Sequence, residues 1–165
     1  MKDDELLIKK DRMRYTKNKL SASLVYLAIL FDVFFFVSIY KSDVSTYYYT
    51  ILIGASIIYN LVFLLLSFLS SEGVKEYSEK YCYLLFVLAL IQIIRIFILP
   101  IKAHSAVVKI AGVERIVMDN GQFARCIVYL LISSISLFAS AIVGIIRSRT
   151  LKSYLATLGE EVRRD

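Results

Sequence analysis

Residues 81–101 read YCYLLFVLALIQIIRIFILPI, an almost unbroken apolar run that closes at Pro100. A helix that crosses a bilayer needs roughly 20 apolar residues, and this run is long enough. It has no polar face, whereas a helix of a soluble domain keeps one side in contact with water. The run therefore predicts a membrane-spanning helix, interrupted only by the polar residues Gln92 and Arg95.

Three further runs have the same character, and they cover residues 20–40, 47–69 and 123–146. Each is continuously apolar, whereas a strand of a membrane barrel spans about ten residues and alternates. Hydrophobic residues make up 58% of the chain, more than the roughly 45–50% of soluble domains. We therefore predict an all-α membrane protein whose one domain, residues 20–146, is a bundle of four transmembrane helices.

The positions of Lys and Arg predict the orientation of this bundle. These residues crowd residues 1–19, residues 147–165 and the loop at residues 70–80, and they are sparser in the two remaining loops. Because positive residues are retained on the cytoplasmic side, we expect both termini in the cytoplasm and outer loops at residues 41–46 and 102–122. The composition is rich in Lys, Ile and Tyr and free of Trp, which favours an AT-rich bacterial genome and hence a bacterial plasma membrane.

The basic ends also bear on binding partners. The net charge of +6 is compatible with nucleic-acid binding, but membrane topology already accounts for the clusters, so we expect no nucleic-acid partner. The basic N-terminal segment enforces the topology, and the alternative is that it also holds anionic lipid headgroups.

Two segments outside the apolar runs have amphipathic patterns. In the second outer loop, Ala106, Ile110, Val113 and Val117 fall at helical spacing. This spacing favours either an interfacial helix on the outer surface or a loop packed on top of the bundle, and both alternatives stay open.

The C-terminal tail, residues 147–165, carries a similar stripe. Its apolar members are Leu151, Tyr154, Leu155, Leu158 and Val162. The stripe predicts an amphipathic cytoplasmic helix that docks on a partner. We favour a protein partner because acidic residues near the end of the tail weaken the attraction to anionic lipid. The alternative is a solvated continuation of the fourth apolar run.

Two charged residues, Asp32 and Arg95, lie inside apolar runs. A charge in the bilayer core costs at least about 2.5–3.5 kcal/mol, so each requires a partner. Counted from the cytoplasmic end, the depths of the two residues differ by roughly 3 Å at 1.5 Å per residue. We therefore predict an Asp32–Arg95 ion pair between the first and third helices. The alternatives are that Arg95 snorkels outward or bonds a partner subunit, or that the charges mark a transport path.

Other polar and small side chains recur at helical spacing. The second run carries Ser56, Asn60, Ser67 and Ser71 on one face, and Gln92 lies one turn before Arg95. Such groups bond across helices for about 0.6–2 kcal/mol each. In the fourth run, Ser136, Ser140 and Gly144 are spaced by four residues. This face of small residues allows another helix to approach closely, from this chain or from a different subunit.

No motif in the sequence indicates catalysis. Asp32 is the only carboxylate deep inside an apolar run, and the chain has no CxxC pair, Cys/His cluster or glycine-rich phosphate loop. We therefore expect no enzyme activity, no cofactor and no metal.

Two functions remain for a bundle of this kind. The first is a non-catalytic accessory or structural subunit of a larger membrane complex, such as a transporter or secretion assembly. The second is a small homo-oligomeric channel or transporter whose path is lined by Asp32, Asn60, Gln92 and Arg95. The expected partners are the lipid bilayer and either other membrane subunits or further copies of the chain.

Overall fold

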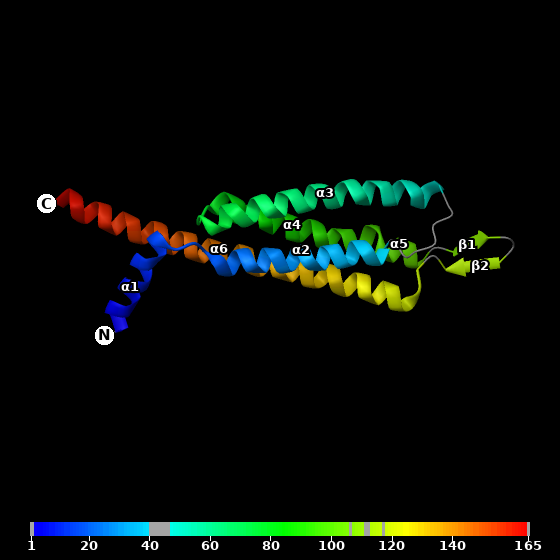
Figure 1. Ribbon diagram of the computed structural model, residues 1–165, viewed down its shortest axis with the longest axis horizontal. Helices are drawn as coiled ribbons and strands as arrows, with labels where there is room; N and C mark the ends of the chain where they lie inside the picture. The colour runs from blue at the N-terminus through cyan, green and yellow to red at the C-terminus, as the bar shows by residue number, and fades with distance from the viewer. Residues whose placement is uncertain (1, 40–46, 106, 111–112, 117, 165) are drawn as a thin grey trace.

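In the computed structural model, four long helices lie side by side (Figure 1). They are α2 (Lys19–Ile39), α3 (Tyr47–Lys75), α4 (Glu79–Ile98) and α6 (Asn120–Arg164). The structure describes residues 2–39, 47–105, 107–110, 113–116 and 118–164. Each of the four helices contains a stretch that is long and apolar enough to cross a membrane. The predicted set of four membrane-length helices is therefore confirmed.

The helix ends follow from local chemistry. The side-chain Oδ1 of Asn18 accepts the backbone N–H of Ser21 at 3.4 Å, which is an N-cap for α2. Pro100 separates α4 from the short helix α5 (Pro100–His104), because proline has no N–H to donate and its ring clashes with the preceding turn.

The end of α3 is a Schellman motif, in which two N–H groups beyond the helix satisfy its last carbonyls. Tyr77 N–H donates to the Val74 carbonyl at 3.2 Å, and Ser78 N–H donates to the Gly73 carbonyl at 3.1 Å. Tyr77 has a φ of 58°, the left-handed conformation that glycine usually occupies at this position. The chain reverses within this turn, so α3 and α4 form an antiparallel pair.

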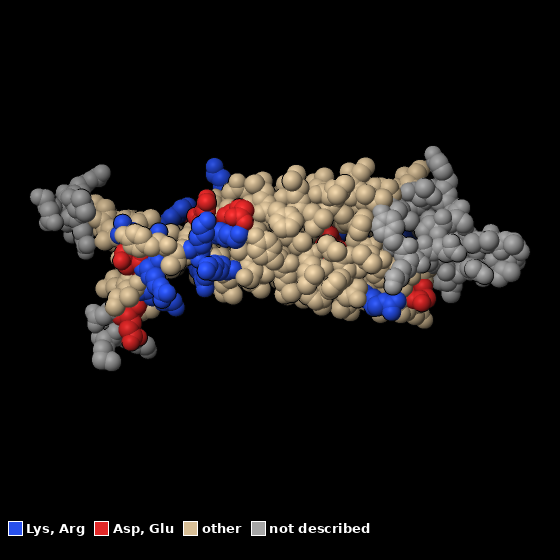
Figure 2. Space-filling view, in the orientation of Figure 1, with Lys and Arg blue, Asp and Glu red and all other residues tan. Residues whose placement is uncertain are grey.

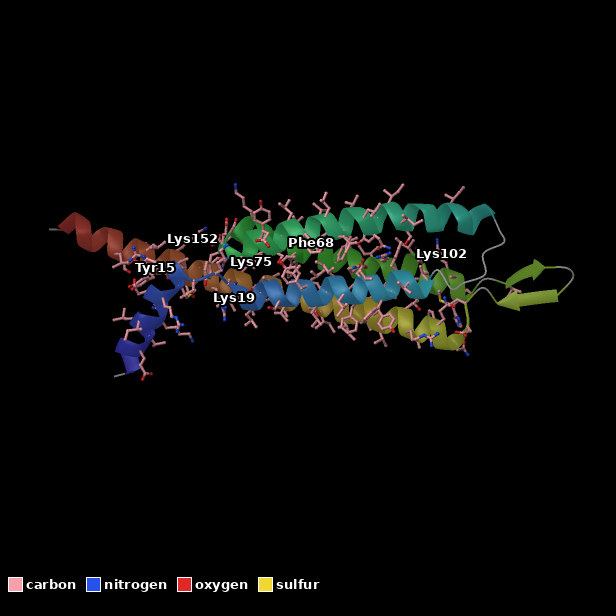
Figure 3. All side chains as sticks on the ribbon, in the orientation of Figure 1. Tyr15, Lys19, Phe68, Lys75, Lys102 and Lys152 are labelled. Carbon is pink, nitrogen blue, oxygen red and sulfur yellow. The ribbon has the colours of Figure 1, made fainter. Side chains whose placement is uncertain are left out.

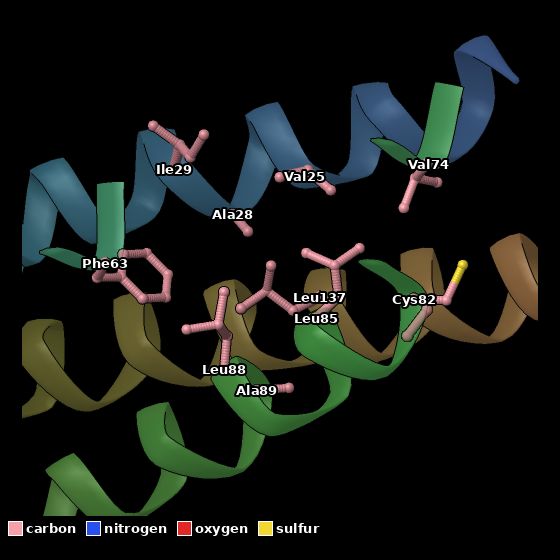
Figure 4. Packing of buried hydrophobic residues seen from close by; sticks show 11 residues of the cluster. Val25, Ala28, Ile29, Phe63, Val74, Cys82, Leu85, Leu88, Ala89 and Leu137 are labelled. Atoms are coloured by element: carbon pink, nitrogen blue, oxygen red, sulfur yellow. The ribbon is translucent and has the colours of Figure 1, made fainter. Parts of the chain in front are cut away.

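The core of the bundle is apolar and lies between α2, α4 and α6. Figure 4 shows Val25 of α2, Leu85 of α4 and Leu137 of α6 packed against one another. A second buried cluster toward the other end includes Phe35 and Leu130. α6 packs along both α2 and α4, whereas α3 packs on α2 and α4 from one side. α3 is therefore the peripheral helix of the bundle.

The segment at residues 102–122 does not form the interfacial helix that was one of the two alternatives left open by its spacing. It contains the end of α5 and a hairpin of β1 (Val107–Ile110) and β2 (Val113–Ile116), paired antiparallel with Ile110 opposite Val113. Ala106 and Val117 lie outside the described residues. The physical reason is that two runs rich in β-branched residues flank a two-residue connection that contains glycine, a pattern that favours a hairpin over a helix.

Both ends of the chain extend from the opposite end of the bundle. α6 continues past the bundle as a single helix, and α1 (Lys2–Tyr15) turns away from the bundle axis beside it (Figure 1). We call residues 147–164 of α6 the arm. The predicted amphipathic tail is thus continuous with the fourth apolar helix. Tyr154 of the arm faces α1, where its Oη donates to Asp11 Oδ1 at 3.5 Å.

Candidate functional site

Helices α2 and α4 bring Asp32 and Arg95 together in the interior of the bundle. Arg95 Nη1 lies 2.9 Å from Asp32 Oδ1, and the two side chains are 6% and 1% exposed, respectively. The two helices run in the same direction because α3 lies between them in the sequence, so residues at equal depth can face each other. The guanidinium is turned into the bundle, not outward toward the end of α4.

Neighbouring side chains extend this pair into a network across all four helices. Gln92 Nε2 donates to Asp32 Oδ1 at 2.9 Å, and Arg95 Nη2 donates to the Ser56 hydroxyl of α3 at 3.0 Å. Gln92 Nε2 also lies 3.5 Å from the Ser133 hydroxyl of α6. We call these five residues the polar network. Its bonds stabilise one relative arrangement of the helices, because they join α4 to each of the other three.

Two aromatic rings enclose the guanidinium of Arg95. Its Cζ lies 4.4 Å from the ring centroid of Phe35 and 4.5 Å from that of Tyr59. The negative faces of the rings replace part of the hydration that the cation loses. The sequence interpretation missed both aromatic residues. The signal was available, because Phe35 follows Asp32 by three positions and Tyr59 follows Ser56 by three, which places each pair on one helix face.

Asn60 lies on the same inward face of α3 but does not join the polar network. Asn60, Ser67 and Ser71 are buried. The amide oxygen and nitrogen of Asn60 and the hydroxyl of Ser67 have no hydrogen-bond partner within the described structure. The Ser71 hydroxyl interacts with the Tyr26 hydroxyl of α2. We call Asn60 and Ser67 the unpaired stripe. A buried polar group without a partner costs about 1–3 kcal/mol.

The small residues of α6 are used within the chain. The Ser140 hydroxyl donates to the Ser21 carbonyl of α2 at 2.8 Å. A Cβ added at Gly144 would lie 2.6 Å from the Cys82 sulfur of α4. Ser136 is also buried. The close approach that the spacing predicts is therefore made to α2 and α4 of the same chain.

The chemistry available to the polar network is limited. A guanidinium does not lose its proton in proteins, and here its charge is opposed by one carboxylate and shielded by two rings. Across the part of the chain that the structure describes, no three His, Cys, Asp or Glu side chains gather to hold a metal ion. This arrangement suits the joining of helices better than the activation of a nucleophile or a water molecule.

No family model, curated protein or solved structure matches this chain. The fold and the site define the chain as a helical protein with four membrane-length helices and a buried ionic network.

Proposed function

We propose that this chain is a non-catalytic accessory or structural subunit of a larger membrane complex, such as a transporter or secretion assembly. In this proposal it lies in a bacterial plasma membrane with both termini in the cytoplasm. One observation carries the proposal: α6 is a single helix that continues as the arm beyond the bundle. Residues 147–164 extend about 27 Å at 1.5 Å per residue, a projection that a self-contained bundle does not require.

The surface of the arm supports a docking role. Leu155 is 44% exposed, and it belongs to the predicted apolar stripe. Leu151 and Leu158 are partly buried, and Tyr154 is hydrogen-bonded to Asp11 of α1. The Val162 side chain lies outside the described part of the arm. An apolar side chain on a polar helix is stabilised when a partner covers it, as in helix-in-groove recognition.

The hydrogen bonds inside the bundle support a role as a rigid membrane anchor for the arm. The polar network joins all four helices through its hydrogen bonds. Movement of α2 against α4 would leave Asp32 and Arg95 buried without their ionic partner, which is strongly unfavourable. A rigid bundle of this kind holds the arm at a fixed position relative to the membrane.

The charge distribution supports the proposed orientation. Lys and Arg side chains gather at the end of the bundle that carries α1 and the arm, and the middle of the bundle is almost free of charge (Figure 2). Lys19, Lys75 and Lys152 all lie toward that end, whereas Lys102 lies toward the hairpin (Figure 3). A basic end on the cytoplasmic side is the arrangement that membrane insertion favours.

Site-specific photo-crosslinking in the native membrane tests the docking role. A photoactivatable residue at Leu155 should give one discrete product with one other membrane-complex protein. The same residue at Thr157, which is exposed on the opposite side of the helix, is the matched control and should give none. Leu155→Glu should release the chain from that complex in mild detergent, whereas Thr157→Glu should not. Equal crosslinking from both positions, or none, would count against the proposal.

A homo-oligomeric channel or transporter is the second candidate, and the unpaired stripe favours it. Ordered water is the usual partner of buried polar atoms that have none in the protein, and the stripe runs from the level of Arg95 toward the cytoplasmic end of α3. Such a path would lie inside each bundle, because Asp32, Asn60 and Gln92 are buried within a single chain.

Ion flux into liposomes that contain the purified chain distinguishes the two candidates. The proposed function predicts no flux above that of empty liposomes. A flux that Asn60→Leu abolishes, while the variant keeps its helical content and thermal stability, would replace the proposed function with the second candidate.

A further inference from the structure

A cleft of about 460 Å³ lies where α1, the segment that follows it, the turn between α3 and α4, and the beginning of the arm meet. Its cationic lining residues are Lys9, Lys10, Arg12, Lys17 and Arg147. None of the described residues that line it is acidic. We call it the basic cleft. Five like charges around one hollow repel one another, so an anion that enters the cleft relieves this repulsion.

One of these cations is held in place by the fold. Arg147 Nη1 donates to Asn18 Oδ1 at 2.7 Å. Asn18 is fully buried, caps α2, and donates its backbone N–H to the Lys75 carbonyl at 3.0 Å. The guanidinium has five N–H donors, so this bond orients it and leaves donors for a ligand. Arg147 is therefore a preorganised anion-binding group on the bundle, not a flexible surface charge.

Tyr77 also lines the basic cleft, and its backbone is strained. It occupies the left-handed position of the Schellman motif at the end of α3, with a φ of 58°. Glycine adopts this conformation without a steric penalty, whereas a bulky side chain does not. Strain of this kind points toward a role for the side chain. The aromatic ring supplies an amphipathic surface of the sort that prefers the headgroup layer.

The position of the cleft along the bundle bears on the kind of anion that it can bind. Arg147 directly follows Ile146, where the apolar run of α6 ends, and Lys17 directly precedes the cap of α2. The cleft thus lies at the end of the membrane-length helices, where headgroups are found. Leu6 and Met13 add apolar surface beside the cations. A phosphate with an attached glycerol and acyl chains fits this combination, whereas a free phosphate uses only the cations.

We propose that the basic cleft binds the headgroup of an anionic phospholipid. Arg147 contacts the phosphate, the α1 cations surround it, and Tyr77 and Leu6 pack against the glycerol region. α1 then closes over the headgroup and is held at the membrane surface. This inference does not depend on the identity of any partner complex.

Binding of defined lipids to the purified full-length chain tests this proposal. The probes are phosphatidylglycerol, phosphatidylcholine and inorganic phosphate, and the readouts are native mass spectrometry and the shift in Tm. Phosphatidylglycerol should remain bound and raise Tm, whereas phosphatidylcholine and inorganic phosphate should not. Equal retention of phosphatidylcholine, or an equal Tm shift with inorganic phosphate, would overturn the assignment to an anionic lipid.

Three variants locate the site. Arg147→Gln should weaken phosphatidylglycerol binding by about fivefold, since one cation near a membrane surface contributes about 1 kcal/mol. Arg14→Gln is the matched control: it removes a cation that lies on α1, pairs with Asp11 and does not line the cleft. Tyr77→Gly relieves the backbone strain, so it should fold at least as well as the wild type and still bind the lipid more weakly. Equal binding by Arg147→Gln and Arg14→Gln, or wild-type binding by Tyr77→Gly, would overturn the proposed site.

Discussion

Two groups of polar side chains lie inside the same bundle, equally buried and differently bonded. In the polar network, Asp32, Gln92 and Arg95 are connected by hydrogen bonds. In the unpaired stripe, Asn60 and Ser67 are as deeply buried, and their side-chain polar atoms have no partner among the described residues. The comparison teaches that burial alone does not decide what a polar residue contributes to stability. The presence of a partner within reach decides it.

Helix position explains the difference. The network is centred on α2 and α4, whose long side chains meet across the packed centre of the bundle. The stripe lies on α3, where 33% of the apolar stretch is buried, compared with 44% for each of the other three helices. Ser56 of this helix has a partner because the long Arg95 side chain of α4 reaches it, whereas no described side chain bonds the polar atoms of Asn60 or the hydroxyl of Ser67.

Loss of the cation in the network should have the largest effect. Arg95→Met leaves the Asp32 carboxylate buried without a counter-charge, so the free energy of unfolding should fall by about 3–5 kcal/mol. Unfolding of the purified protein by SDS in mixed micelles, followed by circular dichroism, measures this change. The double variant Asp32→Leu/Arg95→Met should recover most of the loss, because no unpaired charge remains. If Arg95→Met is as stable as the wild type, the bonded residues of the polar network contribute no more to stability than those of the unpaired stripe.

Loss of the neutral member of the network should have a smaller effect. Gln92→Leu removes the bond from Nε2 to the Asp32 carboxylate, and bonds to charged groups contribute about 1.5–3 kcal/mol. The same unfolding titration measures the loss. Ile94→Leu, at an exposed position of the same helix, is the control and should change stability by less than about 0.5 kcal/mol. Equal effects of the two substitutions would mean that the bond to Asp32 adds nothing.

Two serines of α3 allow the two groups to be compared directly, because one belongs to the polar network and the other to the unpaired stripe. Ser56 accepts a hydrogen bond from Arg95, whereas the Ser67 hydroxyl has no partner among the residues that the structure describes. Ser56→Ala should therefore destabilise the bundle by about 1 kcal/mol, within the range of interhelical bonds in membrane proteins. Ser67→Ala removes a buried hydroxyl that has no partner among the described residues, so stability should stay unchanged or rise by up to about 1 kcal/mol. A reversed order in thermal unfolding of the two variants would show that burial, not bonding, governs stability here.

The Asn60 amide should likewise contribute nothing to stability. Asn60→Leu replaces an unpartnered amide with an apolar group of similar size, so stability should stay unchanged or rise by up to about 1 kcal/mol. The SDS unfolding titration also measures the stability of this variant. A loss of more than about 1 kcal/mol would mean that water or another molecule satisfies the amide, and it would strengthen the channel candidate.

Part of the site was predictable from the sequence, because helical rise converts residue number into depth. Counting from the ends of the apolar runs placed Asp32 and Arg95 at one height, and the structure places them in contact. The structure of residues 102–122 was not predictable in this way. The spacing of Ile110 and Val113 is compatible with a helix, but these residues also belong to two short β-branched runs that pair as strands. A segment this short fits both the helical period and the strand period. The spacing of its apolar residues therefore does not distinguish a helix from a hairpin.

The sequence by itself determined the number of membrane-length helices, because the length of an apolar run is a local property that does not depend on the rest of the fold. Only the tertiary structure decided which polar atoms find partners. Three features depend on how each helix is rotated about its own axis: the enclosure of Arg95 by Phe35 and Tyr59, the contact between Asn18 and Arg147, and the lack of a partner for Asn60 among the described residues. Packing of all four helices together fixes that rotation, and no single run of residues encodes it.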